Sequence, residues 1–353
     1  MGCSRGTRFT FHLLAIAFFV AGFAQPSTSD QTVVAAYLPE YRFYIDVEAA
    51  VQHLTDVILF SVSPRRDGSL DDHWLKAPDI RRVRRAADAV PGRPVNVLVC
   101  LGGAGRSEHF ASVAQSKAKR DLLASNLLAL AERHELDGVD FDWEAPQTPR
   151  EMGDYVKLLR AARRALRPAG KLVTVALHPG QALGGAPDAA AGSSSGSHSA
   201  YGAVDRVHLM AYDMGPGHAR REDAVRFTQH QLQSGADPAK LVLGIPAYGR
   251  HTGNPGMVKT YAEFVDELPA EDIPLGDLAG GYTLNGPETA RAKAEWARGA
   301  GLAGVVFWEL GQDKVGHPQS LIRAAAEASG IATVTRTGGA ENEPRRKGTE
   351  TEF

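Results

Sequence analysis

Eight short apolar segments, separated by helix-like segments, constrain the fold of this 353-residue chain more than any other feature. The segments begin at Val33, Asp56, Val95, Asp137, Lys171, Val204, Leu241 and Leu302. Most are nearly continuous in Val, Ile and Leu, which is typical of parallel strands covered by helices on their faces. Strands that alternate with helices eight times over about 300 residues predict an α/β fold of the (β/α)8 TIM-barrel type.

The segments between these strands have the periodicity of amphipathic helices. Apolar residues recur at intervals of three and four, and Pro or Asp opens several segments. Examples span residues 78–90, 116–135, 150–166, 222–235 and 287–301. The alternative is a doubly wound open sheet, which would more often carry a glycine-rich phosphate loop after its first strand. The sequence YLPEYR from Tyr37 is not such a loop, so the barrel is the better prediction.

The N-terminal residues have the pattern of a secretory signal peptide. Arg5 and Arg8 precede an apolar run from Phe9 to Ala24 that ends in small-x-small form. We expect cleavage after Ala24, so that residues 1–24 are removed and the mature protein is secreted, with a vacuole or lysosome as other destinations. An uncleaved membrane anchor is the alternative, but the run is short for the roughly 20 residues that span a bilayer.

Residues 25–332 are predicted to form the barrel. Two segments do not fit the alternation. Residues 184–200 are small and polar and predict a mobile loop, and residues 333–353 lack apolar periodicity and predict a disordered tail. The formal net charge of −2 and the absence of charge blocks before that tail indicate no nucleic-acid or anionic-membrane partner. The sequence carries no signal of oligomeric state.

The fourth strand, within the stretch LDGVDFDWEAP, alternates acidic and aromatic residues. Because side chains in a strand alternate between faces, Asp140, Asp142 and Glu144 share one face, while Phe141 and Trp143 share the other. In a barrel the apolar face packs against helices and the acidic face points into the lumen. The carboxyl groups then meet at the C-terminal mouth, where barrel enzymes have their active sites.

Crowded carboxyl groups cannot all ionise, so at least one is expected to hold a proton near neutral pH. A protonated carboxyl beside a charged one can protonate a leaving-group oxygen. Glu144, last on the strand, is best placed to be that acid. The alternatives are a solvated acidic edge and a Ca²⁺ loop. Phe141 and Trp143 fit poorly in a calcium loop, and such strong strand formers do not bracket a solvated edge.

The octapeptide DGVDFDWE, residues 137–144, resembles the DxxDxDxE signature of glycoside hydrolase family 18, the chitinase family, at every specified position. Further motifs of that family follow other strands in order, and the resemblance extends over roughly Val33 to Ala332. These motifs are the end of SxGG at Leu101–Gly103, MxYD at Met210–Asp213, GxPxYGR at Gly244–Arg250, and a tryptophan at Trp308. The resemblance implies a barrel hydrolase without metal or cofactor.

In that family the substrate's own 2-acetamido group is the nucleophile. The resemblance implies that Glu144 protonates the glycosidic oxygen and later activates water. Asp142 would orient the acetamido group and stabilise the oxazolinium intermediate, and Asp140 would share a proton with Asp142. Tyr212 would donate a hydrogen bond to the acetamido carbonyl.

The resemblance also implies a set of substrate-binding residues. Met210 and Asp213 would line the same subsite, with Trp308 as its apolar floor. Tyr248 and Arg250 are weaker candidates, because an Arg after a strand often only caps a helix or forms a surface ion pair. On their own, Met210 and Trp308 would more often be core residues than substrate-binding residues.

The chain departs from the family pattern at several positions. Cys100 stands where SxGG has Ser, and a lone buried Cys usually behaves as a small hydrophobe. Ala104 and Ala145 stand where many chitinases have aromatic residues. Only residues 251–285 are available between the seventh strand and the last predicted helix, as in members that lack a large α+β insertion. We expect a shallower groove that suits soluble or short chains.

The predicted substrate is chitin or an N-acetylglucosamine oligosaccharide. One alternative is an endo-β-N-acetylglucosaminidase that cuts the chitobiose core of N-glycans, because fold does not fix substrate. A second is a non-catalytic chitin-binding lectin, although such members typically lose the glutamate and Glu144 is intact. A metal-dependent hydrolase is disfavoured, because no histidines have ligand spacing. These include His134, His178, His208, His218 and His251.

Overall fold

The computed structural model describes residues 32–185, 200–267 and 276–331. The predicted signal peptide, the predicted C-terminal tail and most of the predicted loop at 184–200 lie outside these residues. In the described part of the chain, no helix combines the length and the apolar character needed to cross a bilayer.

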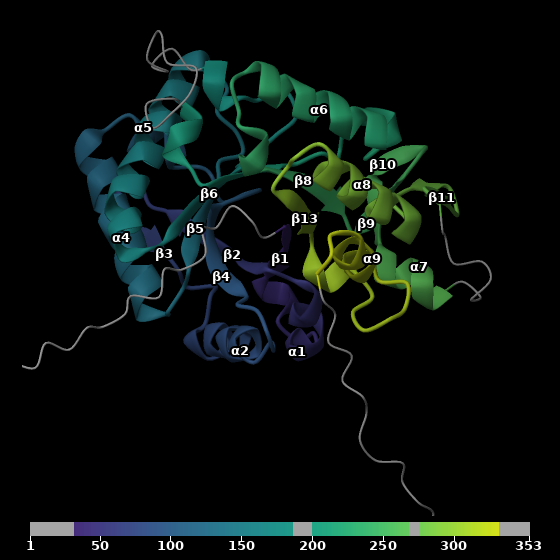
Figure 1. Cartoon of the computed structure of the whole chain (residues 1–353). Helices are drawn as coiled ribbons and strands as arrows, with labels where there is room; N and C mark the ends of the chain where they lie inside the picture. The colour runs from purple at the N-terminus through teal and green to yellow at the C-terminus, as the bar shows by residue number, and fades with distance from the viewer. Residues whose placement is uncertain (1–31, 186–199, 268–275, 332–353) are drawn as a thin grey trace, which may run out of the picture. The chain divides into compact units, whose positions relative to one another are not determined.

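Eight parallel strands close into a barrel, because β1 pairs with both β2 and β13 (Figure 1). Each strand falls on one of the eight apolar segments, so the predicted (β/α)8 fold is confirmed. The strands are β1 (Val33–Pro39), β2 (Asp56–Pro64), β4 (Asn96–Gly102), β5 (Gly138–Asp142), β6 (Leu172–Leu177), β7 (Arg206–Leu209), β8 (Leu241–Pro246) and β13 (Gly304–Trp308). A two-residue strand, β3 (Leu70–Asp71), pairs antiparallel with β2.

Helices cover the outside of the barrel (Figure 1). They are α1 (Val47–Ala50), α2 (Ala77–Asp88), α3 (Phe110–Ala114), α4 (Lys117–Arg133), α5 (Pro149–Leu166), α6 (Arg221–Gln233), α8 (Pro287–Gly299) and α9 (Leu321–Ala328). Helix α5 shows how the sequence sets a boundary. Thr148 and Glu151 form a reciprocal capping box, and Pro149 occupies the first turn, where its missing N–H costs nothing.

The strand residues divide into two buried layers. Outward-facing residues such as Val99, Phe141 and Val175 pack with the helices in the large core. Inward-facing residues such as Ala35, Ile58 and Val306 fill the barrel interior. The period-2 alternation of a strand places neighbours along the chain in different layers. Polar side chains of β5, β6 and β7 also point inward, and these belong to the site.

A small antiparallel sheet follows β8. It has the order β10-β9-β12-β11 and is built from β9 (Tyr248–His251), β10 (Asn254–Thr260), β11 (Leu278–Ala279) and β12 (Tyr282–Thr283). Helix α7 (Tyr261–Glu267) follows β10. The sequence indicated only a short insertion here, and this sheet is how that insertion folds.

Candidate active site

A pocket of about 290 Å³ lies at the C-terminal ends of the barrel strands. Asp142 and Trp308 end β5 and β13, and Met210 directly follows β7. The pocket is lined by Tyr37, Ala104, Asp142, Glu144, His178, Met210, Tyr212, Asp213, Tyr248, Arg250, Val258, Trp308 and Gln312. Of the nine site residues predicted from the sequence, all except Asp140 line this pocket.

The acidic strand is shorter than the sequence indicated. β5 ends at Asp142, so Glu144 lies beyond the strand and not at its last position. The backbone N–H of Glu144 donates to the hydroxyl of Ser107 at 3.0 Å instead of to a neighbouring strand. Trp143 turns to the helix side, where it stacks on Phe110 with centroids 5.4 Å apart. The side chain of Glu144 is one-quarter exposed and reaches the pocket.

Asp140 is fully buried behind the pocket and has polar partners on three other strands. The Thr174 hydroxyl donates to Oδ1 at 2.5 Å, and the Tyr37 hydroxyl donates to Oδ2 at 2.8 Å. Nδ1 of His208 lies 3.1 Å from Oδ1. No sequence motif marks any of these three partners. Together they replace the water that this carboxylate loses on burial.

Asp142 lies between Asp140 and Glu144, and its Oδ1 atom is buried without a hydrogen-bond partner. Burial, followed by the charges of Glu144 and Asp140, raises the pKa of Asp142 well above its usual value. A protonated carboxyl in this position avoids an unpaired buried charge next to two other carboxyl groups. The raised pKa that carboxyl crowding predicts therefore belongs to Asp142.

Two glycines let the end of β4 approach the end of β5. Gly102 and Gly103 have φ of 102° and 94°, a region that favours glycine. A Cβ on Gly102 would lie 2.3 Å from the carbonyl oxygen of Asp142, and one on Gly103 would lie 2.2 Å from Cζ of Phe60. The N–H of Gly103 donates to that carbonyl at 2.7 Å. The Leu-Gly-Gly motif thus fixes the backbone under Asp142.

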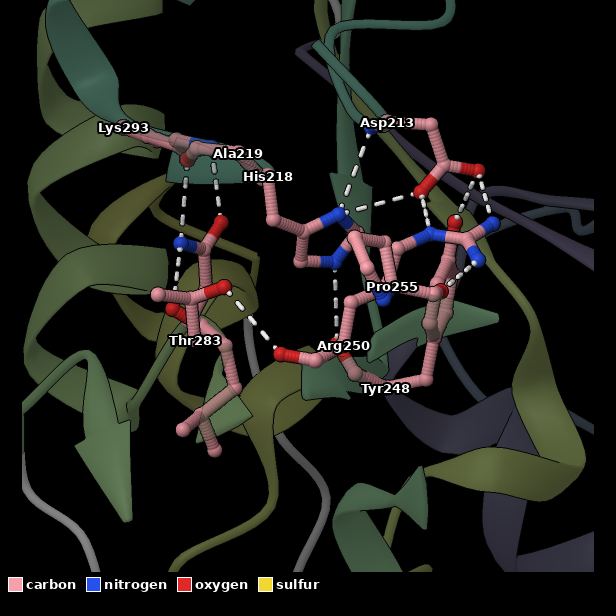
Figure 2. Close-up of polar contacts among 10 residues, drawn as sticks. Asp213, His218, Ala219, Tyr248, Arg250, Pro255, Thr283 and Lys293 are labelled. Atoms are coloured by element: carbon pink, nitrogen blue, oxygen red, sulfur yellow. Dashed lines mark hydrogen bonds and ion pairs between the residues drawn. The ribbon is translucent and has the colours of Figure 1, made fainter. Parts of the chain in front are cut away.

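Asp213 is the centre of a hydrogen-bond network at the pocket wall (Figure 2). It accepts from the Tyr248 hydroxyl at 2.8 Å and from Nη2 of Arg250 at 2.6 Å, and Nδ1 of His218 lies 3.0 Å away. Burial alone would raise the pKa of Asp213, but the hydrogen bonds from Arg250, His218 and Tyr248 hold it well below its usual value. Asp213 therefore stays ionised and ties the β9–β10 hairpin to the barrel.

Two aromatic side chains complete the pocket. Tyr212 is 8% exposed, and burial, followed by the nearby Tyr248 and Asp142, raises its pKa well above the usual value. Its hydroxyl therefore keeps its proton and can donate a hydrogen bond. The Trp308 indole rests against Phe60 and Tyr37, with centroid distances of 4.8 and 5.4 Å. It gives the pocket a rigid apolar surface.

The structure adds residues that the sequence analysis did not assign to the site. His178, directly after β6, places Nε2 3.3 Å from Oε2 of Glu144. Val258 contributes from β10, and Gln312 from the 3₁₀ turn Leu310–Gln312. In the described ranges, no group of three or more His, Cys, Asp and Glu side chains is arranged to hold a metal ion. The side chains present suit general acid–base chemistry on a ring that stacks on an indole.

Comparisons with known proteins identify the family and the fold. The model of Glycosyl hydrolases family 18 matches residues 33–313. The class V chitinase CHIT5a of Medicago truncatula is 26% identical over 277 aligned residues, covering 63% of this chain and 70% of that protein. The GH18 chitinase ChiB from the chitin utilization locus of Flavobacterium johnsoniae has a TM-score of 0.69 at 24% identity, covering 85% of this chain and 94% of that one. A mutant class V chitinase from Nicotiana tobaccum in complex with NAG4 has a TM-score of 0.68 at 20% identity, covering 85% and 99%.

Proposed function

The chain belongs to glycosyl hydrolases family 18, and from this membership we propose that it hydrolyses β-1,4 bonds in chitin or in N-acetylglucosamine oligosaccharides. The observation that carries the proposal is Asp142, which is buried, lines the pocket together with Glu144, and stands two residues from both Asp140 and Glu144 in the chain. The chitinase relative and the neighbour in complex with NAG4 support this substrate class.

In the first step, Glu144 gives its proton to the glycosidic oxygen. The acetamido oxygen of the substrate forms a bond to C1 as the bond between C1 and the leaving oxygen breaks. The product of this step is an oxazolinium ion. Asp142 passes its proton toward Asp140, and the freed carboxylate oxygen accepts the acetamido N–H and stabilises the developing positive charge.

In the second step, a water molecule attacks C1 and gives its proton to Glu144. The bond between C1 and the acetamido oxygen breaks, which restores the acetamido group and the starting protonation of the enzyme. Two displacements at C1 leave the product with the configuration of the substrate. Glu144 thus serves first as acid and then as base.

The remaining pocket residues hold the substrate. The Tyr212 hydroxyl donates to the acetamido carbonyl and keeps it near C1. The apolar face of the sugar stacks on Trp308, and Met210 fills the space beside it. Asp213, held by Tyr248 and Arg250, forms the facing wall.

The pocket rim supports a preference for soluble or short chains. Ala104 lines the pocket and Ala145 directly follows Glu144, so neither position offers a ring to a longer saccharide. The β9–β10 hairpin contributes Val258, which is 46% exposed. Faster hydrolysis of oligomers than of colloidal chitin would agree with this preference, and the reverse order would contradict it.

We also infer that residues 1–24 are removed as a signal peptide and that the mature enzyme acts outside the cell or in a vacuole or lysosome. N-terminal sequencing of the protein from the native secretory host tests this inference. A mature N-terminus at Gln25 is the expected result. An intact N-terminus on a membrane-associated protein would contradict it.

Mass spectrometry of products from the N-acetylglucosamine tetramer, pentamer and hexamer tests the proposed reaction. The wild type should cleave them, and Glu144→Gln should lose activity by about a thousandfold. Glu108→Gln is the matched control, because that side chain is 86% exposed, and it should keep full activity.

If the wild type leaves all three oligomers intact, the proposal is wrong. A high-mannose glycopeptide in the same assay then separates the remaining functions. Cleavage within its chitobiose core would indicate an endo-β-N-acetylglucosaminidase. An intact glycopeptide, together with retention of the protein on chitin, would indicate a glycan-binding protein.

A further inference from the structure

A histidine contacts the carboxyl group that the proposed function makes the acid. Nε2 of His178 lies 3.3 Å from Oε2 of Glu144, and both side chains line the pocket. The imidazole is 38% exposed. The His178 side chain is therefore neither buried in the core nor fully solvated.

The backbone under both side chains is fixed. The N–H of His178 donates to Oε1 of Gln181 at 2.9 Å, and the N–H of Gln181 returns a bond to the His178 carbonyl at 3.0 Å. The carbonyl of Gln181 accepts from Nε2 of Gln231 in α6 at 2.6 Å. Beyond the end of the neighbouring strand, β5, the Ser107 hydroxyl accepts a hydrogen bond from the N–H of Glu144. The two side chains meet because β5 and β6 are adjacent.

A glutamate beyond the end of a strand has three rotatable side-chain bonds, and most of its rotamers do not point toward a bound substrate. A hydrogen bond to one carboxyl oxygen removes that freedom before the substrate arrives. With a proton on Nε2, the imidazole is close enough to Oε2 of Glu144 to donate to it. The other oxygen, Oε1, is then left to carry the proton to the glycosidic oxygen.

We propose that His178 is a positioning residue, which holds Oε2 of Glu144 so that the carboxyl presents its proton to the leaving oxygen. This inference rests on the proposed function. It adds that the acid acts as a pair with an imidazole that directly follows the neighbouring strand, β6. The imidazole forms no bond to the substrate and takes no proton from it.

The first test compares kcat and KM of wild type, His178→Ala, His178→Gln and His178→Asn on the N-acetylglucosamine hexamer. Loss of one orienting hydrogen bond should lower kcat about tenfold in the alanine variant, with KM nearly unchanged. Glutamine places its amide nitrogen about where Nε2 lies and should restore most of the rate. Asparagine reaches only the Nδ1 position and should not.

His109→Ala is the matched control. His109 is 34% exposed and lies 4.0 Å from the exposed carboxylate of Glu108. The substitution therefore removes a comparable imidazole that lies outside the pocket. Its kcat should equal that of the wild type. Equal melting temperatures of all variants would show that a change in kcat does not come from unfolding.

The second test varies the leaving group. In a 2,4-dinitrophenyl glycoside of the N-acetylglucosamine dimer, the leaving group is 2,4-dinitrophenolate, which departs without help from an acid. A sugar leaving group, in contrast, needs a full proton. His178→Ala should therefore be nearly as fast as wild type on the dinitrophenyl substrate and about tenfold slower on the hexamer. An equal loss on both substrates would overturn the inference, because the imidazole would then act on binding or folding. No loss on either would also overturn it.

Glu144→Gln, measured in parallel, separates this inference from the proposed function. Full activity of Glu144→Gln on the hexamer overturns both, because there is then no acid for His178 to hold. Loss of activity in Glu144→Gln with wild-type rates in His178→Ala overturns only the role of His178.

Discussion

The imidazole of His208 lies 3.1 Å from the carboxylate of Asp140 inside the barrel, where the two side chains are 2% and 0% exposed. Nε2 of His208 is buried and has no hydrogen-bond partner, and the Tyr37 hydroxyl lies 3.3 Å from Nδ1. Nδ1 thus lies between the Tyr37 hydroxyl and the Asp140 carboxylate, whereas a proton on Nε2 would be a buried donor without an acceptor. The imidazole of His208 therefore helps to hold Asp140 in place as the partner of Asp142.

Replacing His208 tests this arrangement. His208→Ala removes the imidazole that lies against Asp140 and leaves a cavity, so kcat on the N-acetylglucosamine hexamer should fall about 10- to 100-fold. His208→Asn can place its amide nitrogen near the position of Nδ1 and should lose less. Steady-state kinetics on both variants, with their melting temperatures, measure the effect. A wild-type kcat in His208→Ala would show that Asp140 does not need this imidazole.

Tyr212→Phe removes the hydroxyl that is proposed to hold the acetamido group. The ring still packs at a centroid distance of 6.4 Å from Tyr248, so the fold should be unaffected. We expect kcat to fall about 10- to 100-fold, since the hydrogen bond matters most as the acetamido oxygen approaches C1. Kinetics on the hexamer measure this loss. A change confined to KM would contradict this prediction, because the hydroxyl would then stabilise the bound substrate and the transition state equally.

Asp213→Asn should make stability less sensitive to acid. Because the folded-state pKa of Asp213 is lowered, its stabilising effect is complete above its unfolded pKa of about 3.9 and is lost as the pH falls toward the folded value. The melting temperature of the wild type should exceed that of the variant at pH 6, and the two should converge between about pH 5 and pH 2. The control Asp88→Asn changes a side chain that is 61% exposed and should show no such convergence. A constant difference across this range would contradict the prediction.

Lys293 in α8 is fully buried near Ala219 (Figure 2). Its ammonium donates to the Ala219 carbonyl at 2.8 Å and to Oδ1 of Asn285 at 2.7 Å. Burial lowers its pKa to about 7. Between that value and about 10.4, the unfolded chain binds a proton that the folded chain does not, so stability rises with pH.

Chemical denaturation of wild type and Lys293→Met between pH 7 and 9 measures this effect. The free energy of unfolding of the wild type should rise relative to the variant by roughly 2 kcal/mol. Lys117→Met changes a side chain that is 80% exposed. Its free energy of unfolding should change with pH as that of the wild type does. If the difference in free energy of unfolding between wild type and Lys293→Met does not change with pH, the lowered pKa of Lys293 is contradicted.

The sequence predicted the barrel well, because each strand is an apolar segment long enough to be recognised as a strand without its neighbours. The acids of β5 and the residues that follow β7 and β8 were also predicted, since family motifs mark them. Tyr37, Thr174 and His208 carry no such mark. Their side chains meet Asp140 only because closure of the barrel and the register of its strands bring inward positions of β1, β6 and β7 together.

Other features depend on single local contacts. The early end of β5 follows from the Ser107 hydroxyl. It accepts a hydrogen bond from the N–H of Glu144, which is then not available to pair with a neighbouring strand. His178 meets Glu144 because a hydrogen-bonded turn follows β6. The strands β11 and β12 have two residues each, which is too short for a period-2 pattern to be recognised. Such contacts depend on one or two residues each and leave no periodic pattern.

The most direct test of the central claim is the anomeric configuration of the first product from the N-acetylglucosamine hexamer, followed by proton NMR before mutarotation. The account predicts that the new reducing end appears as the β-anomer, because attack by the acetamido oxygen and then by water inverts C1 twice. Initial release of the α-anomer would mean a single displacement by water. That result would contradict the roles assigned to Glu144 and Asp142.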